Sequence, residues 1–288
     1  MNLPFDKWVA CWGNATSITD RKEATYGRDL TLRYPIPMCF DGSRLRFRFS
    51  NLTGTEPVRM TRALIARTAP DAPTSRRVLP ETSAALTFGG QTEALLPIGG
   101  EITSDALDFP VTAGENVTVS LYFADFVQLN AGTLVTGPLS KGYFAYGDHA
   151  AEADLPDDQT RNTGWFYFLN TVEVLTEARN RALICYGDSI TAQSWPDLLT
   201  LRCRALGAAH TAIIRRAVSG TRVLRQYDCA TYAAYGLKGA TRFPIELRAA
   251  GAETIILQQG INDIIHPVGV EENRFSPGSA LTTAQERY

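Results

Sequence analysis

The first part of the chain alternates between apolar and polar positions with the period of β-strands. Residues 45–49 read Leu-Arg-Phe-Arg-Phe, so that every second side chain is apolar, as in a strand with one buried and one solvated face. Residues 117–123 and 165–169 are rich in β-branched and aromatic side chains, which favour strands. Glycine-containing turn sequences separate these segments. The pattern predicts a jelly-roll-like all-β sandwich over residues 1–178, with a long polar surface loop at residues 141–163.

A different pattern follows the charged segment 176–181. Short apolar runs at residues 183–186, 212–218 and 254–258 predict buried strands, and segments 196–206 and 243–250 between them predict helices. Strands that alternate with helices at this spacing are typical of a parallel sheet with right-handed crossovers. We therefore expect a second, α/β domain over residues 179–288.

Composition and charge argue against several classes of protein. The 288 residues are 44% hydrophobic and 20% charged, which indicates a globular protein with a substantial core. The net charge of −2 and the lack of a basic stripe argue against binding to nucleic acid, and no apolar run has the length of a membrane span. The N-terminal segment lacks the apolar core of a signal peptide, which predicts a cytoplasmic protein; a secreted protein whose signal had been removed would look the same.

Five scattered cysteines indicate neither a zinc site nor a disulfide framework, and we expect no metal and no organic cofactor.

Each of the three predicted parallel strands ends in a short segment of small and polar residues. These segments are Gly187-Asp188-Ser189, Ser219-Gly220-Thr221 and Gly260-Ile261-Asn262-Asp263. The carboxyl ends of neighbouring parallel strands meet at one edge of a sheet, so we expect the three segments to converge. A serine hydroxyl that attacks a carbonyl needs hydrogen-bond donors for the developing oxyanion. Ser189 is the candidate nucleophile, and its own N–H, the Gly220 N–H and the Asn262 amide are the candidate donors.

These three segments, in this order, resemble the first three sequence blocks of the SGNH (GDSL) hydrolases. The resemblance implies a flavodoxin-like, three-layer α/β domain, ester hydrolysis, and catalytic roles for Ser189, Gly220 and Asn262. Residues 42–51, 87–90 and 104–105 are similar to the jelly-roll domain that precedes the hydrolase domain in one branch of the family. The implied substrate is a small-molecule or carbohydrate ester of an acetyl or other short acyl group, and the residues that bind it are not predicted.

The family's fourth block, Asp-x-x-His, would supply the general base, and the sequence lacks it. Of the three histidines, His149 falls in the predicted polar loop, His210 precedes the second parallel strand, and only His266 follows Asn262 closely. A flavodoxin-like sheet has five strands, and three are predicted, so we interpret the hydrolase domain as C-terminally truncated. Because a serine without a base is a poor nucleophile, we expect weak or no esterase activity.

Two other functions stay open at this stage. A hydrolase that has lost its base could persist as a carbohydrate-binding protein, since jelly-roll domains often bind sugars. A nucleotide- or flavin-binding protein would share the α/β fold class, but the sequence has neither G-x-G-x-x-G nor G-x-x-x-x-G-K-[ST]. The sequence does not predict the oligomeric state.

Overall fold

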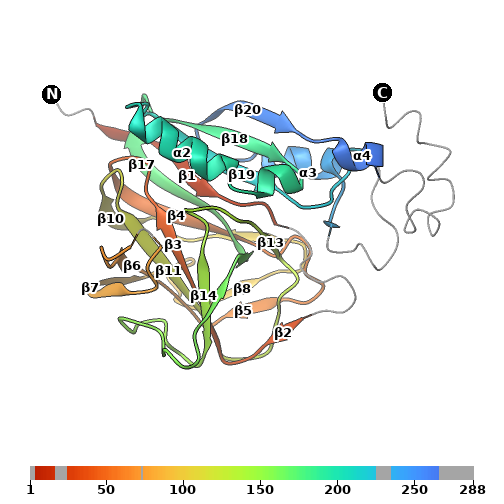
Figure 1. Ribbon diagram of the computed structural model, residues 1–288. Coiled ribbons are helices and arrows are strands. Elements are labelled where there is room, and N and C mark those ends of the chain that lie inside the picture. Colours follow the sequence, from red (N-terminus) through yellow and green to blue (C-terminus); the bar gives the residue numbers. More distant parts are fainter. Residues whose placement is uncertain (1–3, 17–24, 73, 225–234, 266–288) are drawn as a thin grey trace.

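The computed structural model describes residues 4–16, 25–72, 74–224 and 235–265. Strands make up most of its regular structure and helices are few, so the expectation of a β-rich fold is confirmed (Figure 1). Antiparallel pairing dominates the N-terminal part, and parallel pairing begins after Glu177, where β17 ends and β18 follows from Arg181.

Two antiparallel sheets build the N-terminal part. The first has the order β1 (Phe5–Gly13), β17 (Leu169–Glu177), β4 (Gly42–Ser50) and β10 (Leu107–Val111), with β9 (Glu101–Thr103) also paired to β4. The second has the order β15 (Arg161–Thr163), β14 (Gly142–Tyr146), β3 (Leu30–Pro37), β11 (Asn116–Phe123), β6 (Arg62–Thr68) and β7 (Val78–Ala85). Three short pairs complete this part: β2 (Tyr26–Gly27) with β12 (Val127–Gln128), β5 (Val58–Met60) with β8 (Ala94–Leu96), and β13 (Gly132–Leu134) with β16 (Trp165–Tyr167).

The prediction of one long loop at residues 141–163 is wrong, because β14 and β15 lie within it. Residues 143–146 of β14 pair with β3 and its first residues pair with β15, which makes β14 an internal strand of the second sheet. The short aromatic run of β14 is followed by a segment with four aspartates and Pro156, and this polar surrounding obscured the strand pattern.

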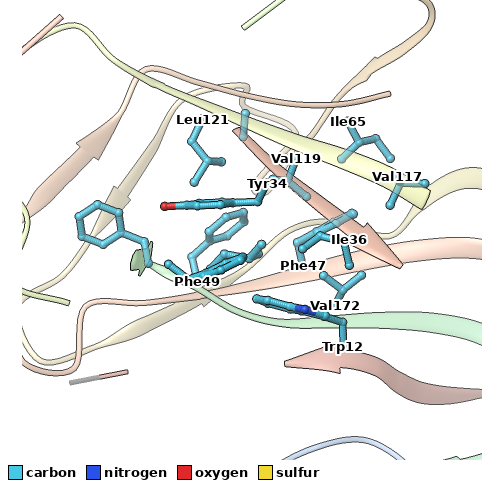
Figure 2. Close-up of a cluster of buried hydrophobic side chains, with 14 of the residues drawn as sticks. Trp12, Tyr34, Ile36, Phe47, Phe49, Ile65, Val117, Val119, Leu121 and Val172 are labelled. Atoms are coloured by element: carbon cyan, nitrogen blue, oxygen red, sulfur yellow. The ribbon is translucent and has the colours of Figure 1, made fainter. Parts of the chain in front are cut away.

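The two large sheets pack face to face around an apolar core (Figure 2). Tyr34 and Ile36 of β3 lie opposite Phe47 and Phe49 of β4, and all four side chains are fully buried. The ring of Tyr34 stacks on Phe166 with centroids 4.7 Å apart. Burial of each such side chain contributes about 1.5–3 kcal/mol to stability. The alternation that marked residues 45–49 is the alternation of core and surface along β4.

The C-terminal part contains a parallel sheet in which β18 (Arg181–Gly187) lies between β19 (Thr211–Ala217) and β20 (Ala252–Gln258). The helices are α1 (Ser189–Ala192), α2 (Trp195–Ala205), α3 (Gly239–Glu246) and α4 (Ile261–Ile265). All three predicted strands are present. The second predicted helix is displaced: α3 begins at Gly239 and ends at Glu246, where the prediction ran from 243 to 250, because residues 248–251 turn the chain into β20 and a glycine start gives no helical signal.

One buried cluster runs through both parts of the molecule. Strand β1 packs against β19, the Ala10 N–H donates to the Ala250 carbonyl at 2.9 Å, and Val9 lies beside Gly251. At the other side of the parallel sheet, β20 pairs only with β18 among the described residues, and Ile255, Ile256 and Leu257 are 42%, 38% and 58% exposed. The parallel sheet is therefore covered on the β19 side and open on the β20 side (Figure 1).

Candidate functional site

The three polar segments predicted from sequence start at the same level of the parallel sheet. In the strand register, Gly187 of β18 lies opposite Ala217 of β19 and Gln258 of β20. Ser189, Gly220 and Asn262 follow these residues by two to four positions. The carboxyl ends of the strands thus form one edge, which we call the rim: residues 187–191, 218–223 and 259–263.

Hydrogen bonds join the rim segments to one another. The Val218 N–H donates to the Gly187 carbonyl at 3.1 Å. The Asn262 amide donates from Nδ2 to the Thr221 carbonyl at 3.1 Å, and the Gln259 amide donates from Nε2 to Thr221 Oγ1 at 3.0 Å. The second and third segments are therefore in direct contact, and the first is tied to the second.

Ser189 is the first residue of α1 and is half-buried. Its position depends on Asp188, whose Oδ1 accepts a hydrogen bond from the Ile190 N–H at 3.0 Å and so caps the helix. Thr191, one position further, is buried and donates from Oγ1 to the Gln258 side chain at 2.8 Å. These two contacts fix the turn that carries Ser189 against β18 and β20.

Glycines with positive φ form the turns that carry Gly220 and Asn262. Gly220 has φ +80°, and a Cβ at this position would lie 2.2 Å from the ring of Tyr235. Gly260 has φ +121° and begins the turn into α4, which holds Asn262 at 5% exposure. The group that approaches the Gly220 Cα in the structure is the Tyr235 ring.

Asp263 stabilises the second rim segment from the third. Both of its carboxylate oxygens accept from the Val223 N–H, at 2.8 and 2.9 Å. Burial is the largest influence on this carboxyl group and raises its pKa. Burial also raises the pKa of Asp188, and the charge of Asp263 adds to that effect. The rim thus contains two buried acids whose ionised forms are less favourable than in water.

Arg242 of α3 contacts the rim, and the sequence did not predict this. Its side chain is fully buried, its Nη2 donates to the Gly187 carbonyl at 3.2 Å, and its guanidinium lies over the Tyr186 ring at 4.8 Å. It also forms an ion pair with Glu246 one helical turn away, at 3.6 Å. The i, i+4 spacing of Arg242 and Glu246 was the signal available in the sequence, but that spacing is more common on exposed helix faces.

The described histidines lie away from the rim. His149 is in the β-sandwich, where Nδ1 contacts Glu152 Oε2 at 2.8 Å and Nε2 contacts the Tyr146 carbonyl at 2.9 Å. His210 precedes β19, at the opposite end of the parallel sheet, with Nδ1 2.8 Å from Asn180 Oδ1. His266 lies outside the described residues. Within the described ranges, no group of three or more His, Cys, Asp or Glu side chains could hold a metal ion.

The short β13–β16 pair of the β-sandwich borders the rim. Thr133 donates from Oγ1 to the carbonyl of Ala217, the last residue of β19, at 3.1 Å. The Thr136 N–H donates to the Ala192 carbonyl at the end of α1, at 3.0 Å. The sandwich therefore supplies one wall next to the segment that carries Ser189.

Comparison with protein-family models gave no match, and comparison with curated protein sequences gave none either. Among the described residues, no helix has both the length and the hydropathy needed to cross a bilayer.

Proposed function

We propose that this protein is an ester hydrolase of the SGNH type, with a jelly-roll-like N-terminal domain and a flavodoxin-like hydrolase domain. The observation that carries the proposal is the convergence at the rim. The segments with Ser189, Gly220 and Asn262 follow strand residues in a single register, and hydrogen bonds connect them. A half-buried serine at a helix start, at the same sheet edge as an amide side chain and a glycine of positive φ, supports an acyl-transfer site.

In the proposed reaction, Ser189 Oγ adds to the carbonyl carbon of the ester and releases its proton. The carbonyl oxygen becomes an oxyanion, for which the Ser189 N–H, the Gly220 N–H and the Asn262 amide are the proposed donors. The C–O bond to the alcohol then breaks, and the alcohol leaves with a proton from water. Water attacks the acyl-serine, which releases the carboxylic acid and restores the hydroxyl.

The expected rate is low. Neither described histidine lies near Ser189, so the serine proton passes to solvent water in place of a positioned base. Oxyanion donors and substrate binding alone give a residual acceleration of roughly 10³–10⁴-fold over water in a serine hydrolase that lacks its triad.

The test is hydrolysis of p-nitrophenyl esters of graded chain length, with Ser189→Ala as the control. We expect slow hydrolysis that the substitution reduces to the rate without protein, and an acyl group on the Ser189 peptide in mass spectrometry. Fluorophosphonate labelling should modify the same serine, more slowly than in hydrolases with a complete triad. Equal hydrolysis by the wild type and Ser189→Ala would exclude the proposed nucleophile.

A second candidate is a non-catalytic, carbohydrate-binding protein, and one observation favours it. Trp165 and Tyr167 of β16 are both partly exposed, lie 6.2 Å apart between centroids and are inclined by only 22°. Nearly parallel aromatic rings side by side on one strand face suit stacking against sugar rings. Calorimetric titration with soluble oligosaccharides decides the matter: binding that Trp165→Ala abolishes and Ser189→Ala leaves unchanged would support this alternative.

A further inference from the structure

An open apolar hollow lies between α3 and the edge of the parallel sheet. Its volume is about 310 Å³, and its walls are Tyr186, Val223, Ala240, Phe243 and Leu257, with Gln259 at its polar end. Small-molecule sites are typically apolar concavities of ≈ 300–1,000 Å³ with a few polar groups. The hollow is therefore of a size for a small ligand or for one part of a larger ligand.

The polar end of the hollow belongs to the rim. Gln259 donates to Thr221 next to Gly220, and the Val223 N–H is held by Asp263. Tyr186 directly precedes Gly187, where β18 reaches the rim. The hollow and the candidate site thus share the second and third rim segments, and the hollow extends from there along the face of β18 and β20.

The inner wall of the hollow is held in place by specific contacts. The Tyr186 hydroxyl donates to the Gly239 carbonyl at 2.6 Å. The Tyr186 ring meets the Phe243 ring edge to face, with centroids 5.2 Å apart at 86°. The Arg242 guanidinium lies over the Tyr186 ring at 4.8 Å and donates from Nη2 to the Gly187 carbonyl, and these contacts also hold the ring in place. A rigid, aromatic wall of this kind favours apolar groups over hydroxyl-bearing ones.

We propose that this hollow binds the acyl chain of the ester substrate, and that the preferred chain is longer than acetyl. The inference rests on the proposed function, because it assigns the hollow to the acyl group carried by Ser189. An alkyl chain loses no hydrogen bonds on entering an apolar site, whereas a sugar would leave its hydroxyls unpaired there. The sugar or other alcohol part of the ester would then lie on the sandwich side of the rim.

The experiment uses straight-chain alkylboronic acids, from methylboronic to hexylboronic acid, as probes that need no general base. The serine oxygen adds to the empty orbital of boron, its proton goes to solvent, and an anionic tetrahedral boronate forms that mimics the oxyanion intermediate. Dissociation constants are measured by calorimetric titration, with Ser189→Ala to identify binding at the serine. We expect affinity to rise about fourfold for each methylene group until the hollow is filled.

Two variants of the hollow and one matched control sharpen the test. Ala240→Trp fills the hollow and should remove the gain from methylenes beyond the first or second, and Leu257→Ser should reduce the gain per methylene. Thr241→Trp places the same side chain on the exposed face of α3 and should behave as the wild type.

Two outcomes would overturn the inference in different ways. Binding at Ser189 with one affinity for all chain lengths, or a length dependence that Ala240→Trp leaves intact, would contradict the acyl site while the proposed hydrolase stands. Failure of every probe to bind at Ser189 would contradict the hydrolase itself, and the acyl site with it.

Discussion

At the scale of single residues, Asp188 shows how the rim constrains the chemistry around Ser189. The side chain is fully buried, Oδ1 caps α1, and Oδ2 has no hydrogen-bond partner among the described residues. Burial raises the pKa of this carboxyl group in the folded state above its value in the unfolded chain. Between these two pKa values the folded state binds more protons, so stability falls as pH rises through that interval.

Asp188→Asn should therefore stabilise the protein relative to the wild type as pH increases. Asparagine keeps the helix cap and cannot ionise. The free energy of unfolding, from urea denaturation at several pH values, should differ little between the two proteins at acidic pH, where Asp188 is protonated. At neutral pH the variant should be the more stable of the two. A difference that does not change with pH would contradict a raised pKa at Asp188.

Gly220→Ala should destabilise the protein through two separate effects. Its φ of +80° costs an L-residue roughly 1–2 kcal/mol, and the new methyl group would meet the Tyr235 ring. Gly207→Ala is the matched control, because Gly207 has φ +71° and no atom lies within 4 Å of the place that its new methyl group would take. We expect a loss of about 1 kcal/mol for Gly207→Ala and at least about 2 kcal/mol for Gly220→Ala, measured by denaturant unfolding. Equal losses of stability in the two variants would show that the Tyr235 ring moves aside without a measurable loss of free energy.

The sequence could locate Ser189, Gly220 and Asn262 near one another because each follows a recognisable strand, and parallel strands end at a common edge. It could not locate Arg242 or Tyr235. Their contacts with Gly187 and Gly220 depend on how segments outside the sheet fold back on it, and no local pattern encodes that.

At the scale of elements, Arg216 of β19 joins the two parts of the molecule. Its guanidinium is buried and donates to the carbonyls of Asn14 and Asn170, to Thr171 Oγ1 at 2.6 Å, and pairs with Glu246 of α3 at 3.5 Å. Burial lowers the pKa of Arg216 and raises that of Glu246, while each charge opposes the shift of the other. Strands β1, β17 and β19 and helix α3 thus meet at one buried ion pair.

Arg216→Met should cost about 3–5 kcal/mol of stability, because it breaks a buried ion pair and leaves two carbonyl groups buried without their donor, while Glu246 keeps Arg242 as its charged partner. Glu246→Leu should cost at least as much, since it leaves both Arg216 and Arg242 buried without their carboxylate. The double variant Arg216→Met, Glu246→Leu should lose less than the sum of the two single losses, because the ion pair between these two side chains is lost only once. Denaturant unfolding of the wild type, both single variants and the double variant gives the coupling energy. Additive losses would mean that the two side chains do not stabilise each other.

At this scale, sequence patterns predicted the parallel strands and missed one antiparallel strand. Strands β18, β19 and β20 were predicted because continuous apolar runs of this length are typical of parallel strands. Strand β14 was missed because no local pattern shows its pairing with β3, whose residues lie 110 or more positions earlier in the chain. Pairing with the nearby β15 alone would not place β14 inside a sheet.

At the scale of the whole molecule, we expect the exposed edge strand β20 to promote self-association in solution. Ile255, Ile256 and Leu257 are exposed, and their backbone has no further strand partner among the described residues. Edges of this kind promote pairing with other chains. Ile256→Lys should reduce self-association, seen as a smaller weight-average mass in light scattering at high protein concentration. Lysine at the exposed Thr241 of α3 is the control, and an equal reduction there would point to net charge as the cause.

The packing of β1 against β19 has a consequence for the order of folding. The first strand of the chain completes its contacts only with residues that are synthesised more than 200 positions later, as the bond between Ala10 and Ala250 shows. During translation, β1 therefore lacks these contacts until the residues up to Ala250 have been synthesised. We expect β1 to reach its native contacts with β19 late and slowly, because contacts so distant along the chain retard folding.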